Sequence, residues 1–100
     1  MTVYAALAEP HRRQILDLLR DSERPVNELV GHLRISQPGV SKHLKVLREA
    51  GLVHVRRAGK QRWYALAPRP LAEVDEWLEP YRAFWSQRLD ALEQHLEENP

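Results

Sequence analysis

Two short amphipathic segments are adjacent in the chain, with only Arg34 and Ile35 between them. Their apolar residues recur at steps of three and four, which predicts two α-helices that each bury one face. Two helices joined by so tight a turn make a helix-turn-helix, and both must pack on one core. The apolar positions are Val26, Leu29, Val30 and Leu33 in the first segment and Val40, Leu44 and Leu47 in the second.

Residues that start and stop helices mark the ends of both segments. Ser36 precedes the second apolar pattern and can accept a backbone N–H as the N-cap, while Pro38 falls in the first turn, where its missing N–H costs nothing. Gly51 is expected to end this helix, and Pro25 lies near the start of the first one. Both helices are therefore short.

The outer face of the second helix carries small, hydrogen-bonding and cationic residues. Such a face suits the major groove of DNA, because Gln and Ser can contact base edges, Lys can pair with phosphates and Gly allows close approach. A solvated face without a ligand has the same composition. We expect base contacts from Gln37, Ser41 and His43, phosphate contacts from Ser36, Lys42 and Lys45, and close backbone approach at Pro38 and Gly39.

Charge is distributed unevenly, although the formal net charge is only +1. Residues 34–63 hold eight Lys and Arg residues against one acid, Glu49, whereas residues 70–98 hold eight acids against Arg82 and Arg88. A polyanion would dock on the middle of the chain and avoid its C-terminal part.

Two runs of strand-forming residues follow the second helix, Leu52–Arg57 and Gln61–Leu66, and Ala58-Gly59-Lys60 joins them. They predict a β-hairpin with Val53 and Val55 on one face and Tyr64 and Leu66 as their partners. Arg56, Lys60 and Arg62 lie near the tip or on the outer face, where we expect them to contact the DNA backbone or the minor groove. An earlier helix carries Ile15, Leu18 and Leu19 on one face. We therefore expect a mainly α protein with a small β-hairpin, a winged helix-turn-helix.

A long apolar stripe runs through residues 70–98. The stripe is too long to be buried by one small domain. A second copy of the chain would cover it, with Leu78, Tyr81, Trp85, Leu89 and Leu92 at the interface; the alternative is that the helix folds back on its own core. Pro80 predicts a kink or a break near Glu79. We expect one domain over residues 1–100, with a winged-helix core at 1–69 and a dimerisation helix at 70–98.

Several of these segments resemble the ArsR-type bacterial winged-helix repressors. ALAEPHRRQILDLL, SQPGVSKHLKVLREAGLV and GKQRWYAL are similar to motifs of the family's first long helix, recognition helix and wing. The closing PLAEVDEWLEPYRAFWSQRLDALEQHLEE resembles a cysteine-free branch with a tryptophan-containing C-terminal helix. The resemblance implies a dimeric DNA-binding transcriptional regulator, usually a repressor.

The metal sites of this family do not match the sequence. With no cysteine, the chain lacks the family's thiolate motif at residues 28–33. His95 and Glu98 form an H-x-x-E pair, but no D-x-H precedes it, and the histidines otherwise show no ligand spacing. We expect no metal and no other cofactor.

An enzyme is not expected either. Ser41 and His43 are the best candidates for a catalytic nucleophile and base. On a helix, however, their side chains point about 200° apart, so no proton can pass directly between them. A winged helix that binds only protein remains an alternative to DNA binding. With no apolar run of transmembrane length, we expect a cytoplasmic homodimeric repressor that binds double-stranded DNA at an inverted-repeat operator and has no membrane partner.

Overall fold

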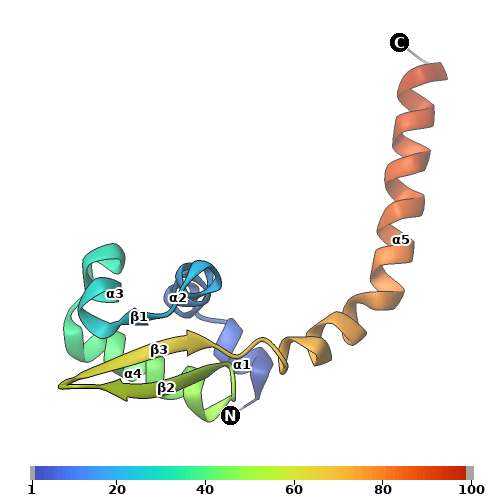
Figure 1. Cartoon of the computed structure of the whole chain (residues 1–100). Helices are drawn as coiled ribbons and strands as arrows, with labels where there is room; N and C mark the ends of the chain where they lie inside the picture. Colours follow the sequence, from blue (N-terminus) through green and yellow to red (C-terminus); the bar gives the residue numbers. More distant parts are fainter. Residues whose placement is uncertain (1, 99–100) are drawn as a thin grey trace.

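The computed structural model describes residues 2–98 (Figure 1). Helices pack with a small sheet in a globular part, and one long helix leaves this part at the C-terminal end. Within the described residues the elements are α1 (Val3–Leu7), α2 (Pro10–Asp21), β1 (Arg24–Pro25), α3 (Val26–Leu33), α4 (Gln37–Glu49), β2 (Val53–Ala58), β3 (Gln61–Leu66) and α5 (Leu71–Glu98).

The sheet is antiparallel, with the order β1-β3-β2. The expected hairpin is confirmed, with Val53 opposite Leu66 and Val55 opposite Tyr64, although β2 begins one residue later than expected. We did not expect α1 or β1. The two residues of β1 pair with the middle of β3, so the start of α3 is joined directly to the hairpin.

One hydrophobic core lies under α2, α3, α4 and the hairpin. Its largest fully buried side chains come from the three helices and from Leu52, just before β2, so each amphipathic helix contributes the face that its periodicity predicted. They are Ile15, Leu29, Val40, Leu44, Leu47 and Leu52. The core therefore fixes α4 against the sheet.

The expected ends of α4 are confirmed. The Ser36 hydroxyl accepts a hydrogen bond from the backbone N–H of Gly39 at 3.2 Å, and Pro38 lies in the first turn. Gly51 follows the helix with a φ of +78°, a conformation that glycine adopts without strain. Arg34, which caps the C-terminus of α3, also has a positive φ, 58°, so this arginine makes the turn between the two helices.

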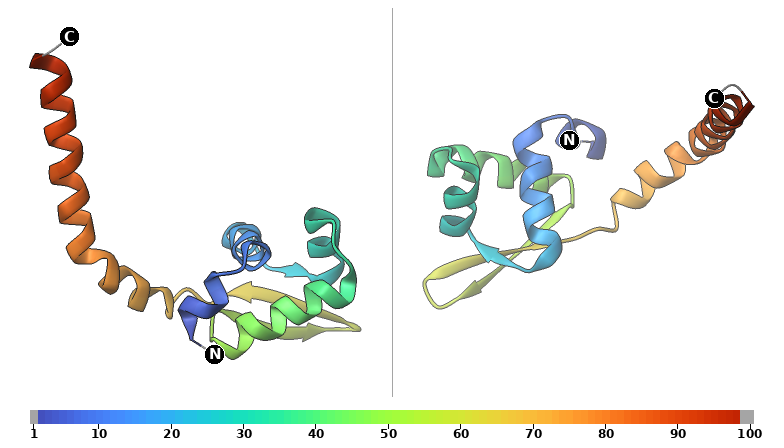
Figure 2. Two further views of the ribbon diagram at one scale, coloured as in Figure 1. Left: turned by 180° about the vertical axis from the view of Figure 1, so that it is seen from behind. Right: turned by 90° about the horizontal axis from the view of Figure 1, so that it is seen from above.

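The long helix α5 packs on the core only at its beginning. Leu71 and Val74 lie against the core, and the ring of Trp77 meets that of Tyr4 of α1 edge to face, with centroids 6.2 Å apart. Beyond them the helix extends away from the globular part, as the three views of Figures 1 and 2 agree. The alternative that α5 folds back over its own core is wrong for this structure.

The projecting helix sets the overall dimensions of the molecule. The radius of gyration is 18.3 Å, against about 13 Å for a compact domain of 100 residues. Pro80 lies inside α5, which bends in its first half without being interrupted (Figure 1). The expected kink is thus present and a break is not. Within residues 2–98, no helix has both the length and the apolar composition that crossing a membrane requires.

Candidate nucleic-acid interface

The exposed face of α4 holds most of the residues that we assigned to DNA. Gln37, Pro38, Ser41, Lys42 and Lys45 are exposed, because Val40, Leu44 and Leu47 take the opposite face into the core. Gly39 is half-buried; a Cβ there would lie 3.2 Å from the Ser36 hydroxyl, a tight contact that the N-cap imposes.

A groove runs between α4 and the hairpin. Its two adjoining hollows share Ser41, Arg62 and Tyr64, so the helix and the wing form one continuous surface. The remaining lining is mostly polar or cationic and comes from β1, α3, α4 and the hairpin: Pro25, Val26, Asn27, Gln37, Leu44, Lys45, Arg48, Lys60 and Gln61. The sequence analysis missed Asn27, Arg48 and Gln61, since their positions follow from packing and not from a motif.

The two faces of the hairpin carry different arginines. Arg57 lies opposite Arg62, and Val55 lies opposite Tyr64, so these residues share the face toward the groove. Arg56 pairs with Trp63 on the other face, where its guanidinium lies 5.6 Å from the Trp63 ring centroid. Arg56 therefore lies on the opposite face of the hairpin from Arg62, and Arg57 lies beside Arg62.

Arg56 also has an acidic partner. Its guanidinium donates to both carboxylate oxygens of Glu23: Nε lies 3.2 Å from Oε1 and 3.0 Å from Oε2, and Nη2 also donates to Oε1. The two side chains form an ion pair. This bonding lowers the pKa of Glu23 and raises that of Arg56. Arg56 is therefore held by the protein itself.

The cations in and beside the groove have no such partner. Within residues 2–98, Lys42, Lys45, Lys60 and Arg62 form no ion pair, whereas Arg24, Arg56 and Arg82 each bond to a carboxylate. Arg48 and Arg57 are likewise unpaired there. An array of unpaired cations on one surface, next to Gln37 and Ser41, is suited to a polyanion that also offers hydrogen-bonding groups.

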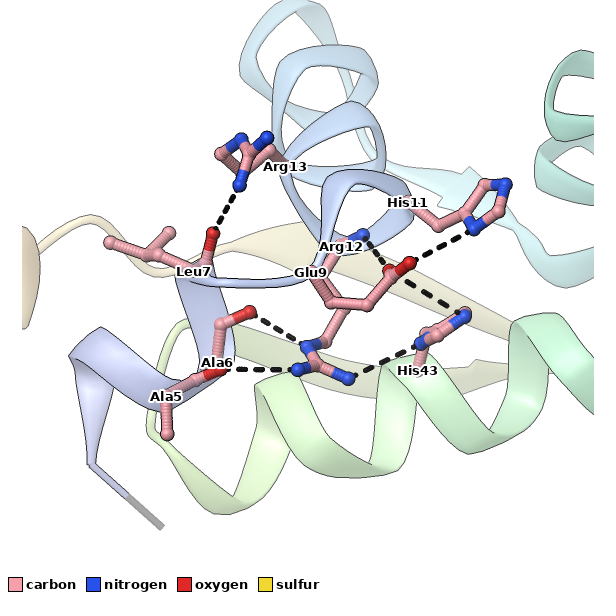
Figure 3. Close-up of polar contacts among 8 residues, drawn as sticks. All are labelled: Ala5, Ala6, Leu7, Glu9, His11, Arg12, Arg13 and His43. Atoms are coloured by element: carbon pink, nitrogen blue, oxygen red, sulfur yellow. Dashed lines mark hydrogen bonds and ion pairs between the residues drawn. The ribbon is translucent and has the colours of Figure 1, made fainter.

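His43 does not share the exposed face of its neighbours. Its ring lies against the start of α2, where Nε2 is 3.7 Å from a carboxylate oxygen of Glu9 and Nδ1 is 3.4 Å from a guanidinium nitrogen of Arg12 (Figure 3). Burial is the main cause that lowers the pKa of His43 below its usual value; the Glu9 carboxylate raises this pKa, and the charges of Arg12, His11 and Lys42 lower it. His43 thus faces α2 and not the exposed face that carries Gln37 and Ser41, and its expected base contact stays a prediction.

Glu9 lies between two histidines. Its carboxylate caps α2 by accepting from the Arg12 backbone N–H at 3.1 Å, and it contacts Nδ1 of His11 at 3.2 Å. Loss of hydration raises the pKa of Glu9, but the Arg12 hydrogen bond and the two histidines lower it more, so the pKa is below its usual value. Potential ligand atoms of Glu9, His11 and His43 lie within 4.8 Å of one another. No local motif indicates this cluster, because His43 lies 34 positions after Glu9 in the chain.

The apolar stripe of α5 is exposed along most of its length. Tyr81, Trp85, Leu89 and Leu92 are 45–64% exposed, while Leu78 is half-buried near the core. Trp77, Phe84 and Leu96 widen and extend the stripe. In a folded protein, an apolar surface this long requires a cover.

Comparison with known proteins identifies a family and several relatives of this chain. Residues 9–55, from the cap of α2 to the first part of the hairpin, match the model of the bacterial regulatory protein, arsR family. The HTH-type transcriptional repressor SmtB of Mycobacterium tuberculosis is 48% identical over 69 residues, which are 69% of this chain and 51% of that protein. The chain thus spans about half the length of this relative.

Two other matches extend over nearly the whole chain. The HTH-type transcriptional regulator Rv2034 of M. tuberculosis is 39% identical over 94 residues, which cover 94% of this chain and 85% of that protein. The structure of an ArsR-like transcriptional regulator from Rhodococcus sp. RHA1 superposes with a TM-score of 0.74 at 31% identity, covering 98% of this chain and 90% of the other. These relatives are named as transcriptional regulators and not as enzymes. The chain belongs to the ArsR family of bacterial regulatory proteins.

Proposed function

We propose that the protein is a homodimeric transcriptional repressor that binds an inverted-repeat operator in double-stranded DNA in the cytoplasm. The observation that carries the proposal is the groove between α4 and the hairpin, whose Lys45, Lys60 and Arg62 have no acidic partner within residues 2–98. Helix α4 enters the major groove, where Gln37 and Ser41 contact base edges.

Phosphate contacts come from the cations around this helix. Lys42 and Lys45 extend from α4, while Lys60 at the hairpin turn and Arg62 of β3 reach the backbone or the minor groove. Arg57 joins Arg62 because the two share a strand pair. Ser36 contributes mainly by capping α4, since its oxygen already accepts the Gly39 N–H.

A second copy of the chain supplies the other half of the site. Its α5 packs on the exposed stripe around Trp85 and Leu89, so that one interface fixes the separation of two α4 helices. Recognition helices of a dimer must lie roughly 34 Å apart to enter successive major grooves. The acids of α5 keep this helix away from the duplex.

Selection from a random DNA pool with the purified protein tests the proposal, because a dimer with two reading helices should enrich an inverted repeat. Fluorescence anisotropy on the enriched duplex then gives the salt dependence. With about six to ten phosphate contacts per dimer, the slope of log affinity against log salt should be near −5 to −9.

The protein-binding alternative predicts a different result. A winged helix that binds only protein has no reason to enrich any duplex, and its weak residual DNA affinity would depend little on sequence. No enriched sequence together with a flat salt response would contradict the proposed function.

A further inference from the structure

The start of α2 and the middle of α4 meet at three side chains with metal-ligand chemistry. Figure 3 shows the Glu9 carboxylate between the rings of His11 and His43. Nδ1 of His11 lies 3.2 Å from one carboxylate oxygen, and Nε2 of His43 lies 3.7 Å from the other. The ring centroids of the two histidines are 5.6 Å apart.

We propose that Glu9, His11 and His43 form a binding site for a divalent transition-metal ion, with Zn²⁺ as the best fit. Ligand atoms of a tetrahedral zinc site lie about 3.3 Å apart, because Zn–N and Zn–O bonds are about 2.0–2.1 Å long. The two nitrogen-oxygen distances here are already close to that value, and all ligand atoms lie within 4.8 Å. Small side-chain rotations would complete the site.

The ligand set favours a borderline metal over Mg²⁺ or Ca²⁺. Two imidazoles and one carboxylate are ligands that Zn²⁺ and neighbouring transition metals accept, whereas Mg²⁺ and Ca²⁺ prefer oxygen alone. The three side chains are 18–39% exposed, so an ion can enter from solvent and water can fill the remaining position.

Arg12 is compatible with an ion at this position. Its guanidinium donates to the carbonyls of Ala6 at 2.7 Å and Ala5 at 3.1 Å, and these bonds hold it on the side of His43 Nδ1. The ion would bind Nε2, on the side of Glu9. A neutral imidazole has one ring proton, so binding through Nε2 requires the tautomer in which this proton is on Nδ1. The 3.4 Å contact of Nδ1 with Arg12, already long, then opens.

Metal titration of the full-length chain tests the site without DNA, so the result is independent of the proposed function. Competition with a chromophoric chelator gives the Zn²⁺ affinity and stoichiometry, and the visible spectrum of Co²⁺ reports coordination geometry. We expect one saturable ion per chain. His11→Gln should weaken binding more than about tenfold, since even an outer-shell partner is worth that much.

Three further variants make the test specific. Glu9→Gln should weaken binding as well, and its amide oxygen can still cap α2. His54→Gln, at an exposed position of β2, should bind Zn²⁺ as the parent does. His95→Gln, which removes the histidine of the H-x-x-E pair in α5, should do the same. Thermal unfolding without metal verifies that each variant folds, and Zn²⁺ should raise the Tm of the parent but not of His11→Gln.

Two results would overturn the proposal. One is the absence of saturable Zn²⁺ binding by the parent protein. The other is equal Zn²⁺ affinity of His11→Gln, Glu9→Gln and His54→Gln in folded protein, which would place any bound ion elsewhere.

Discussion

At the scale of single residues, the side chains of α4 divide by what they can contact. Gln37 has an amide that can form a bidentate bond with adenine, whereas Lys45 is a flexible point charge suited to phosphate. Both are exposed on the groove face of one helix. Two substitutions can therefore separate sequence recognition from general affinity on the same surface.

Gln37→Ala should cost about 1 to 3 kcal/mol in affinity for the operator and little for random DNA, because it removes a base contact. Lys45→Ala should weaken binding to both duplexes by a similar factor and make the salt slope less negative by about one for each phosphate that is no longer neutralised. Anisotropy titrations on both duplexes at several salt concentrations measure these quantities. Equal losses for both variants on every duplex would show that Gln37 does not contact bases.

Glu23 and Arg56 make a pH-dependent contact between the start of β1 and the hairpin. Because the Arg56 hydrogen bond lowers the pKa of Glu23 in the folded protein, the carboxylate contributes to stability above its unfolded pKa, and this contribution is lost as pH falls through the folded pKa. Glu23→Gln should be less stable than the parent at pH 7, by a small amount because the pair is exposed.

Urea unfolding of both proteins from pH 7 down to acid conditions checks this prediction. The difference in free energy of unfolding between parent and variant should shrink toward zero as Glu23 becomes protonated in the folded state. A difference that stays constant with pH would mean that the charge of Glu23 does not stabilise the hairpin.

At the scale of elements, the turn between α3 and α4 depends on one strained residue. Arg34 has a φ of 58°, and the backbone N–H of this residue bonds to the Val30 carbonyl at 3.1 Å, as a helix cap requires. For a residue with a Cβ the left-handed conformation costs about 1 to 2 kcal/mol, and glycine avoids this cost. An exposed arginine is therefore retained at a position that favours glycine.

Arg34→Gly should stabilise the protein by roughly 0.5 to 1 kcal/mol, the relief of strain being partly offset by the larger entropy of the unfolded chain. Arg34→Val should destabilise it by about 1 kcal/mol or more, since β-branched residues tolerate this conformation least. Arg20→Gly, in the last turn of α2, serves as the control and should not stabilise. Denaturant midpoints that rank the variants in another order would contradict the assigned strain.

At the scale of the whole molecule, α5 links assembly to DNA binding. It leaves the globular part and exposes a stripe around Trp85, which is 49% exposed, at the opposite end of the molecule from the hairpin tip (Figure 1). If two copies meet along this stripe, the dimer interface is separate from the two DNA-binding surfaces. A substitution in the interface then leaves the DNA-binding residues unchanged.

Trp85→Glu should place an unpaired charge in each half of the interface, at a cost of several kcal/mol, and leave monomers. Gln87→Glu adds the same charge on the opposite side of α5 and should stay dimeric. Sedimentation followed by operator titration measures both effects, and operator affinity should fall with the dimer. A Trp85→Glu protein that remains dimeric would place the interface elsewhere, and a folded monomer that binds the operator tightly would separate dimerisation from recognition.

The sequence alone determined the elements whose signals are local. The Ser36 cap, the Gly51 stop, the apolar faces of α2, α3 and α4 and the hairpin register were all predictable, because each depends on residues a few positions apart. The same holds for the separation of cations in the middle of the chain from acids in α5. These features were sufficient to indicate a winged helix with a polyanion-binding face.

Only the tertiary structure decided which distant side chains meet. The pairing of Arg24 with Tyr64, the bonding of Arg56 to Glu23 and the approach of His43 to Glu9 join residues 33 to 40 positions apart, so no local periodicity encodes them. They depend on how α2, α4 and the hairpin pack on the common core, which sets the face that each polar side chain presents. For this reason His43 and Arg56, which in sequence look like the polar residues beside them, have contacts within the protein: His43 with Glu9 and Arg56 with Glu23.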